Sequence, residues 1–72
     1  MDNTLEFWQA IKLVSEGEKV ARLSWNYNVE YIYLEKYYFG GMNCIMAKLQ
    51  DGRKIIYNPS WEDMVSSNWY AL

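Results

Sequence analysis

The chain begins with apolar residues at the spacing of a helix. Four of them recur at positions i, i+3, i+4 and i+7 and define one face: Phe7, Ala10, Ile11 and Val14. We expect Asn3 or Thr4 to cap this helix, with Glu6 completing a capping box. Gly17 follows the last apolar residue of the pattern and predicts the end of the helix.

The pattern then changes to short apolar or alternating runs, which are typical of strands. The predicted strands are residues 19–23, 29–34, 43–49, 53–57 and 69–72. Asp51-Gly52 is a strong hairpin signal, so the strand after it should return antiparallel to the strand before it. Residues 35–41, which end in Gly40-Gly41, predict a wide turn with an aromatic tip.

A second, short helix is predicted over residues 61–66. Pro59 suits a helix entry because it has no amide hydrogen, and Ser60 and Asp63 have the spacing of a capping box. The predicted fold is therefore α+β, a small antiparallel sheet with an N-terminal helix and a short C-terminal helix. The element order is α-β-β-β-β-α-β, in one ligand-binding domain of residues 1–72.

The composition adds an excess of aromatic rings to this small fold. The 72 residues include four tryptophans, seven tyrosines and two phenylalanines. A chain of this mass buries only about 60% of its unfolded surface, which is marginal for a lone domain. Either the core is unusually aromatic, or many rings are covered by sister subunits or by a ligand. The second interpretation predicts a homo-oligomer.

Several function classes are disfavoured. The net charge is −2 and the basic residues are scattered, which argues against binding a nucleic-acid polymer. No apolar run approaches the roughly 20 residues of a membrane span, and the N-terminus does not resemble a signal peptide. With no histidine and one cysteine, Cys44, we expect no metal site, no cofactor and no catalysis. A lone cysteine suits a reducing cytosol.

Two aromatic-amide segments are the candidate ligand site. Trp25-Asn26 offers a stacking ring beside an amide that can hydrogen-bond to a polar edge of a ligand. The alternative is a structural role, with the Trp packed at the sheet edge and the Asn in a local turn. The second segment begins at Tyr57 and provides a second ring. Ser60 begins the short helix, where an anion can bind, although a plain helix entry is the alternative.

Two charged residues complete the candidate site. Asp63 can cap the helix or accept hydrogen bonds from a ribose or a base edge. Arg22 is the best-placed cation, and an exposed position on a strand is the alternative. The predicted binding residues are Arg22, Trp25, Asn26, Tyr57, Ser60 and Asp63.

These segments, in this order, resemble the Thoeris anti-defence 2 family of phage and prophage proteins. The matching pieces are residues 7–11, 17–22, 25–26, 31–34, 51–52, 59–60, 63–64 and 68–69. The chain departs from the family pattern at Tyr57 and Asn68, where the family often has Trp and Asp. The resemblance implies a homo-oligomeric sponge, typically a tetramer. Such a sponge acts in the cytoplasm of the infected bacterial host.

The resemblance also implies the ligand and the mechanism. Family members bind a cyclic nucleotide immune messenger, glyco-cyclic ADP-ribose, and some relatives are expected to hold cyclic dinucleotides. They keep the messenger from its effector by mass action, without catalysis. Two alternatives stay open: a protein-binding inhibitor that docks an aromatic patch on a host defence enzyme, and a small structural subunit of a phage particle.

Overall fold

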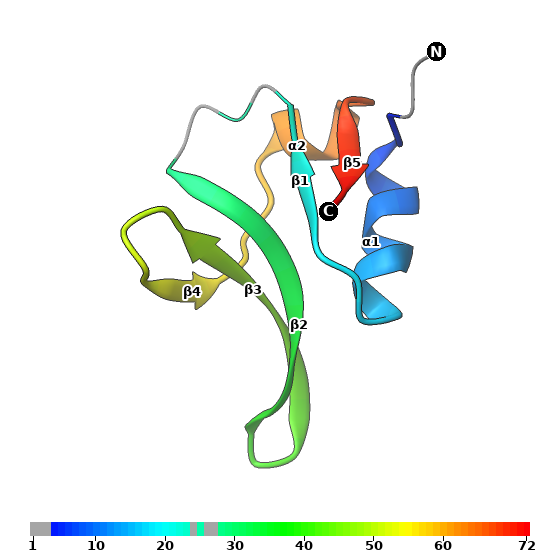
Figure 1. Cartoon of the computed structure of the whole chain (residues 1–72). Helices are drawn as coiled ribbons and strands as arrows, with labels where there is room; N and C mark the ends of the chain where they lie inside the picture. The colour runs from blue at the N-terminus through cyan, green and yellow to red at the C-terminus, as the bar shows by residue number, and fades with distance from the viewer. Residues whose placement is uncertain (1–3, 24, 26–27) are drawn as a thin grey trace.

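The computed structural model describes residues 4–23, 25 and 28–72 (Figure 1). The elements in chain order are α1 (Phe7–Ser15), β1 (Val20–Arg22), β2 (Val29–Phe39), β3 (Met42–Leu49), β4 (Lys54–Ile56), α2 (Trp61–Val65) and β5 (Trp69–Ala71). This confirms the predicted α+β class and the order α-β-β-β-β-α-β.

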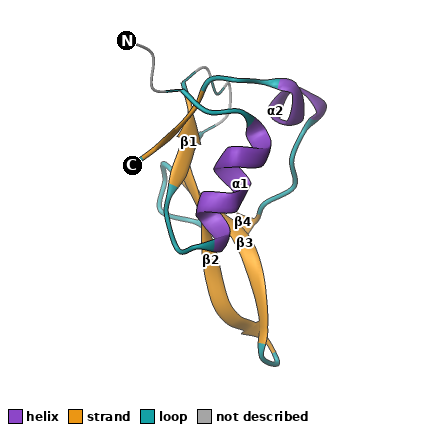
Figure 2. Ribbon diagram, turned by 90° about the vertical axis from the view of Figure 1, so that its right-hand side faces the viewer, coloured by secondary structure: helices purple, strands orange, loops and turns teal. Residues whose placement is uncertain are grey.

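The strands form one antiparallel sheet in the order β4-β3-β2-β1-β5. The last strand therefore returns to pair with the first, at the opposite end of the sheet from β4. Helix α1 packs against β1, β2 and β5, and Figure 2 shows it lying along this part of the sheet. The β2–β3 hairpin continues past the end of α1 (Figure 2).

Helix α1 begins later than the sequence predicts. Leu5 and Trp69 form an isolated antiparallel bridge, with Leu5 N–H donating to the Trp69 carbonyl at 2.7 Å. This extended pairing holds residue 5 outside any helix, so the prediction that Thr4 is the cap is wrong, and Asn3 lies outside the described residues. Glu6 is the N-cap instead, and its amide donates to Gln9 Oε1 at 2.9 Å. The prediction failed because the partner of Leu5 is distant in the sequence.

The predicted end of α1 is confirmed. Gly17 has a φ of +100°, a conformation that side-chain-bearing residues rarely adopt. The amides of Gly17 and Glu18 donate to the carbonyls of Val14 and Leu13, both at 3.0 Å. This is the Schellman arrangement, which satisfies carbonyls left open at a helix end.

The buried core lies between α1 and the sheet. Six buried apolar residues from α1 and four strands form it: Ala10, Val14, Val20, Ile32, Ala47 and Trp69. Trp69 is the largest of them, and it is the one residue of β5 that is fully buried. Cys44 lies on β3 as a strand residue, half-buried.

The β2–β3 hairpin is longer than predicted. Strand β2 runs to Phe39, and only Gly40 and Gly41 form the turn, with φ values of +51° and +98°. Positive φ at both central residues gives the tight turn that matches the twist of the flanking strands. The register shifts between Glu35 and Phe39, which marks a bulge or irregularity where the wide turn was predicted.

The predicted Asp51-Gly52 hairpin is confirmed, and it positions one wall of the candidate site. Leu49 N–H donates to the Arg53 carbonyl at 2.8 Å, and Gly52 has a φ of +97°. Strand β4 spans only Lys54–Ile56 and is exposed throughout. It therefore forms a short sheet edge beside β3, and the chain leaves it at Tyr57 towards α2.

Candidate functional site

The site is organised around the carboxylate of Asp63, which is 2% exposed. Its Oδ1 accepts hydrogen bonds from Arg22 Nη1 and Trp25 Nε1, both at 2.8 Å. Its Oδ2 accepts from the hydroxyl of Tyr57 at 2.8 Å and from the amide of Ser60 at 3.3 Å. Both oxygens are thus occupied by donors of the protein itself.

The donors come from two stretches of chain, residues 22–25 and residues 57–60. Arg22 is the last residue of β1. Its Nε also donates at 3.2 Å to Oδ1 of Asn68, the residue that precedes β5. Tyr57 follows β4, where its amide donates to the Ile45 carbonyl at 2.9 Å. Ser60 is the N-cap of α2, because its Oγ accepts the amide of Asp63 at 3.1 Å. The capping box predicted from the sequence is therefore confirmed.

Trp25 is held by packing as well as by Asp63. Its ring meets the ring of Trp69 edge to face, with centroids 5.2 Å apart and an interplanar angle of 78°. Trp69 in turn donates from Nε1 to the backbone carbonyl of Asp63 at 3.1 Å. The Trp25 ring is fixed by the hydrogen bond of its nitrogen and by its contact with the Trp69 ring, which makes it a preorganised contact surface.

The charge of Asp63 is stabilised despite its burial. Burial is the largest influence on its pKa and raises it, because a carboxylate away from water loses hydration. The hydrogen bonds from Arg22, Tyr57 and Trp25, with that from the Ser60 amide, together outweigh burial and hold the pKa below the usual value of 3.8. Asp63 is consequently an anion, paired with Arg22, at neutral pH.

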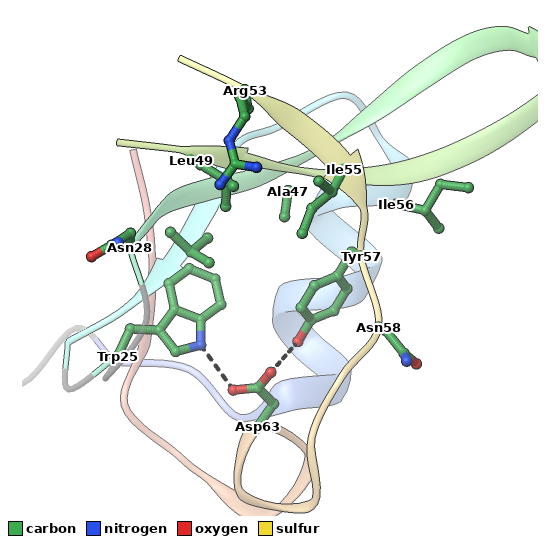
Figure 3. A pocket seen from close by; sticks show the side chains of 11 residues that line it. Trp25, Asn28, Ala47, Leu49, Arg53, Ile55, Ile56, Tyr57, Asn58 and Asp63 are labelled. Carbon is green, nitrogen blue, oxygen red and sulfur yellow. Dashed lines mark hydrogen bonds between the residues drawn. The ribbon is translucent and has the colours of Figure 1, made fainter. Parts of the chain in front are cut away.

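Beside this cluster lies a hollow of about 440 Å³ (Figure 3). The residues that line it are Trp25, Asn28, Val29, Ala47, Leu49, Arg53, Ile55, Ile56, Tyr57, Asn58 and Asp63. Figure 3 shows Trp25 and Tyr57 on either side of Asp63, with Arg53 at the opposite end. Its volume falls within the range of roughly 300–1,000 Å³ that is common for small-molecule sites.

The structure brings together five of the six predicted site residues. Trp25, Tyr57 and Asp63 line the hollow itself. Arg22 and Ser60 do not line it, but both contact the carboxylate of Asp63. The sixth predicted residue, Asn26, lies outside the described residues.

Arg53 lines the hollow but is not among the site residues that the sequence predicts. The pattern of residues 53–57 predicts a strand, where the side chain of a basic residue ordinarily faces water. It lines the hollow because the Asp51-Gly52 turn brings the start of β4 beside the end of β3. A basic residue directly after a hairpin turn was the available signal, and it is a weak one.

The family of the chain follows from a comparison with known protein families. The family model described as the Thoeris anti-defense 2-like domain matches residues 5–72, nearly the whole chain. The chain belongs to the Thoeris anti-defense 2-like family. Membership confirms the resemblance seen in the sequence and supports a role in countering the Thoeris defence system. No curated protein matches the chain.

The Thoeris anti-defense 2-like match covers every element that builds the hollow. It begins at Leu5, the residue that bridges to Trp69, and ends with the chain at Leu72. Family membership favours a non-catalytic role in anti-defence. Among the described residues, no helix is both long and apolar enough to cross a membrane.

Proposed function

We propose that this Thoeris anti-defense 2-like protein binds and sequesters a cyclic nucleotide immune messenger in the hollow beside Asp63. The ligand is glyco-cyclic ADP-ribose or, alternatively, a cyclic dinucleotide. The protein lowers the free messenger by mass action in the cytoplasm of the infected bacterium, and it performs no chemistry on the ligand.

The observation that carries this proposal is the pair of rings fixed by one carboxylate. Trp25 and Tyr57 both donate to Asp63 at 2.8 Å, so their orientations are set before any ligand arrives. Rings fixed in this way favour binding because little side-chain entropy is lost on association. The apolar floor formed by Ala47, Leu49 and Ile55 suits the face of a base.

The predicted residues then take two kinds of role. Trp25 stacks on a base, Tyr57 supplies the second ring, and Asn26 reads a polar edge. Asp63 fixes the two rings rather than contacting the ligand, because both its oxygens already accept from the protein. Arg22 and Ser60 hold Asp63 in place, by the ion pair at 2.8 Å and by the α2 cap.

We further propose that the protein acts as a homo-oligomer, with a tetramer implied by the family. Several large apolar side chains are strongly exposed in the single chain: Trp8, Leu23, Met42, Trp61, Val65 and Leu72. Burying such side chains against sister subunits would stabilise a domain whose own core is small. Light scattering should return a multiple of the 8.6 kDa chain mass.

The binding test is calorimetric titration with glyco-cyclic ADP-ribose and a panel of cyclic dinucleotides. Trp25→Leu removes the stacking ring but keeps an apolar side chain. It should weaken binding about 5- to 150-fold, because stacking is worth roughly 1–3 kcal/mol per base. Tyr31→Leu is the matched control, since it replaces another ring by leucine on β2 and Tyr31 does not line the hollow.

Two results would contradict the proposal. If the wild-type protein binds none of these nucleotides, sequestration itself is wrong. If it binds one, and a folded Trp25→Leu protein of unchanged mass binds equally well, the ligand lies elsewhere. A complementary measurement mixes the protein with extract of cells whose defence is active. Denaturing the recovered protein then releases any captured small molecule for mass spectrometry.

A second candidate function is inhibition of a host defence enzyme by protein docking. Trp61, Met64 and Val65 give the short helix α2 an exposed apolar surface, with Trp61 73% exposed. Exposed tryptophans are frequent anchors of protein interfaces. Recovery of a stoichiometric host protein that Trp61→Ala abolishes, together with no nucleotide binding, would favour this candidate over sequestration.

A further inference from the structure

The hollow has two chemically different ends. At the aromatic end, the negative charge of Asp63 is paired with Arg22, whose side chain is 9% exposed. This end therefore presents balanced charge and two rings. At the other end, Arg53 is the one cationic side chain among the described residues that line the hollow.

Arg53 is held in a defined direction by the hairpin turn. Its Nε donates to Asp51 Oδ2 at 2.8 Å, and its backbone amide donates to Asp51 Oδ1 at 3.0 Å. Asp51 does not line the hollow, whereas Figure 3 shows the guanidinium of Arg53 pointing into it. One of the five N–H groups of Arg53 is thus used for orientation, and the two terminal nitrogens face the hollow.

We propose that Arg53 is the phosphate-recognising residue of this site, so that the hollow selects nucleotides over nucleosides. This inference rests on the proposed nucleotide binding and deepens it. A planar guanidinium fork matches two oxygens of one phosphate group. The ligand then lies with its base at Trp25 and Tyr57 and a phosphate at Arg53.

The floor between the two ends supports this orientation. Ala47, Leu49 and Ile55 offer no hydrogen-bond donors from their side chains, and a phosphate placed over them would lose hydration without compensation. The ion pair with Asp51 does not prevent recognition. The side chains of Arg53 and Asp51 are 70% and 55% exposed, so water screens their attraction. A phosphate can therefore bind the guanidinium while the ion pair is present.

The test compares charged and uncharged ligands on matched variants. Arg53→Gln removes the cation and keeps polarity and approximate length. Lys54→Gln is the control, because Lys54 is the adjacent residue, is similarly exposed and pairs with Glu35 instead. Arg53→Lys keeps the charge without the fork. Each is titrated with the cyclic nucleotide that the wild-type protein binds best, and with adenosine as the uncharged probe.

We expect Arg53→Gln to weaken nucleotide binding about 10- to 100-fold, as for a lost hydrogen bond to a charged group. Lys54→Gln should stay within about twofold, and Arg53→Lys should lie between wild type and Arg53→Gln. Adenosine affinity should be the same in all four proteins. The dependence of nucleotide affinity on salt concentration should also weaken in Arg53→Gln.

The failures of the two proposals are distinguishable. Equal nucleotide affinity of wild type and a folded Arg53→Gln protein overturns the role of Arg53 and leaves sequestration standing. An equal loss in Lys54→Gln also overturns it, because general charge would then explain the effect. If the wild-type protein binds no nucleotide of the panel, both proposals fall together.

Discussion

The two ends of the hollow are built by opposite means. At the aromatic end, Asp63 is almost fully buried and its oxygens receive donors from β1, the following loop, the stretch after β4 and the start of α2. At the other end, Arg53 is exposed and contacts only its near neighbour Asp51 among the ion pairs of the described residues. The Asp63 end is thus held by several elements of the fold, whereas the Arg53 end depends on the hairpin turn alone.

This difference indicates how the same fold can serve different ligands. Changing a residue at the Asp63 end disturbs several elements at once, so that end is expected to tolerate little variation. Changing Arg53 alters only a hairpin side chain. We therefore expect stability and ring geometry to be set at the Asp63 end, and selection among anionic ligands at the Arg53 end.

The largest effect should come from Asp63→Ala. It leaves the buried charge of Arg22 unpaired and removes the acceptor of both rings, which should lower the free energy of unfolding by roughly 3–5 kcal/mol. A chain of this length is stable by only about 4–11 kcal/mol, so the variant should be near unfolding at room temperature. Urea denaturation followed by tryptophan fluorescence measures this loss.

Glu62→Ala is the control for that experiment, because Glu62 is the exposed neighbour of Asp63 in the first turn of α2. It should lose less than about 1 kcal/mol, the usual size of a helix-dipole contribution. Similar losses in the two variants would show that Asp63 matters for the helix and not for the cluster, and the contrast between the two ends would disappear.

The next effect is a dependence on acid. The folded pKa of Asp63 lies below its unfolded value of 3.8, so its contribution is full above that value and is lost as the pH falls through the folded pKa. The carboxamide of Asp63→Asn does not titrate. The stability advantage of wild type over Asp63→Asn should therefore be constant near neutral pH and shrink in acid.

Unfolding curves of wild type and Asp63→Asn between about pH 7 and pH 2 measure this advantage. The pKa of Asp51 is also lowered, chiefly by hydrogen bonds from Arg53, but Asp51 is present in both proteins and its effect cancels. An advantage that stays constant throughout the acid range would mean that the Asp63 carboxylate is not preferentially ionised in the folded state.

A smaller loss is expected from Tyr57→Phe. The variant removes one hydroxyl donor to Asp63 and keeps the ring at the hollow, so the free energy of unfolding should fall by about 1.5–3 kcal/mol. Nucleotide affinity should fall less than in Trp25→Leu, because the ring face remains. Tyr31→Phe, on β2 outside the hollow, is the matched control and should change stability less. A Tyr57→Phe protein as stable as wild type would contradict this prediction.

The elements of the fold could be predicted from the sequence because their signals are local. The Asp51-Gly52 turn, the Ser60 to Asp63 cap and the Gly17 helix end each depend on neighbours within a few residues. The start of α1 could not be predicted, since it depends on Leu5 pairing with Trp69. The sequence predicts Asp63 as a cap of α2, but its contacts with Arg22 and Trp25 could not be predicted, because these donors lie 41 and 38 residues away.

The smallest effect on stability should come from Arg53→Gln, although this variant is expected to weaken nucleotide binding far more than its control Lys54→Gln. The pair between Arg53 and Asp51 is exposed, and such pairs contribute roughly 0–1 kcal/mol. The free energy of unfolding should therefore change by about 0.5 kcal/mol or less, measured by urea denaturation beside Lys54→Gln. A loss above about 1.5 kcal/mol would place Arg53 among the residues that hold the fold. The two ends would then differ in charge alone, and a change in ligand affinity at Arg53 would have to be separated from a change in the hairpin itself.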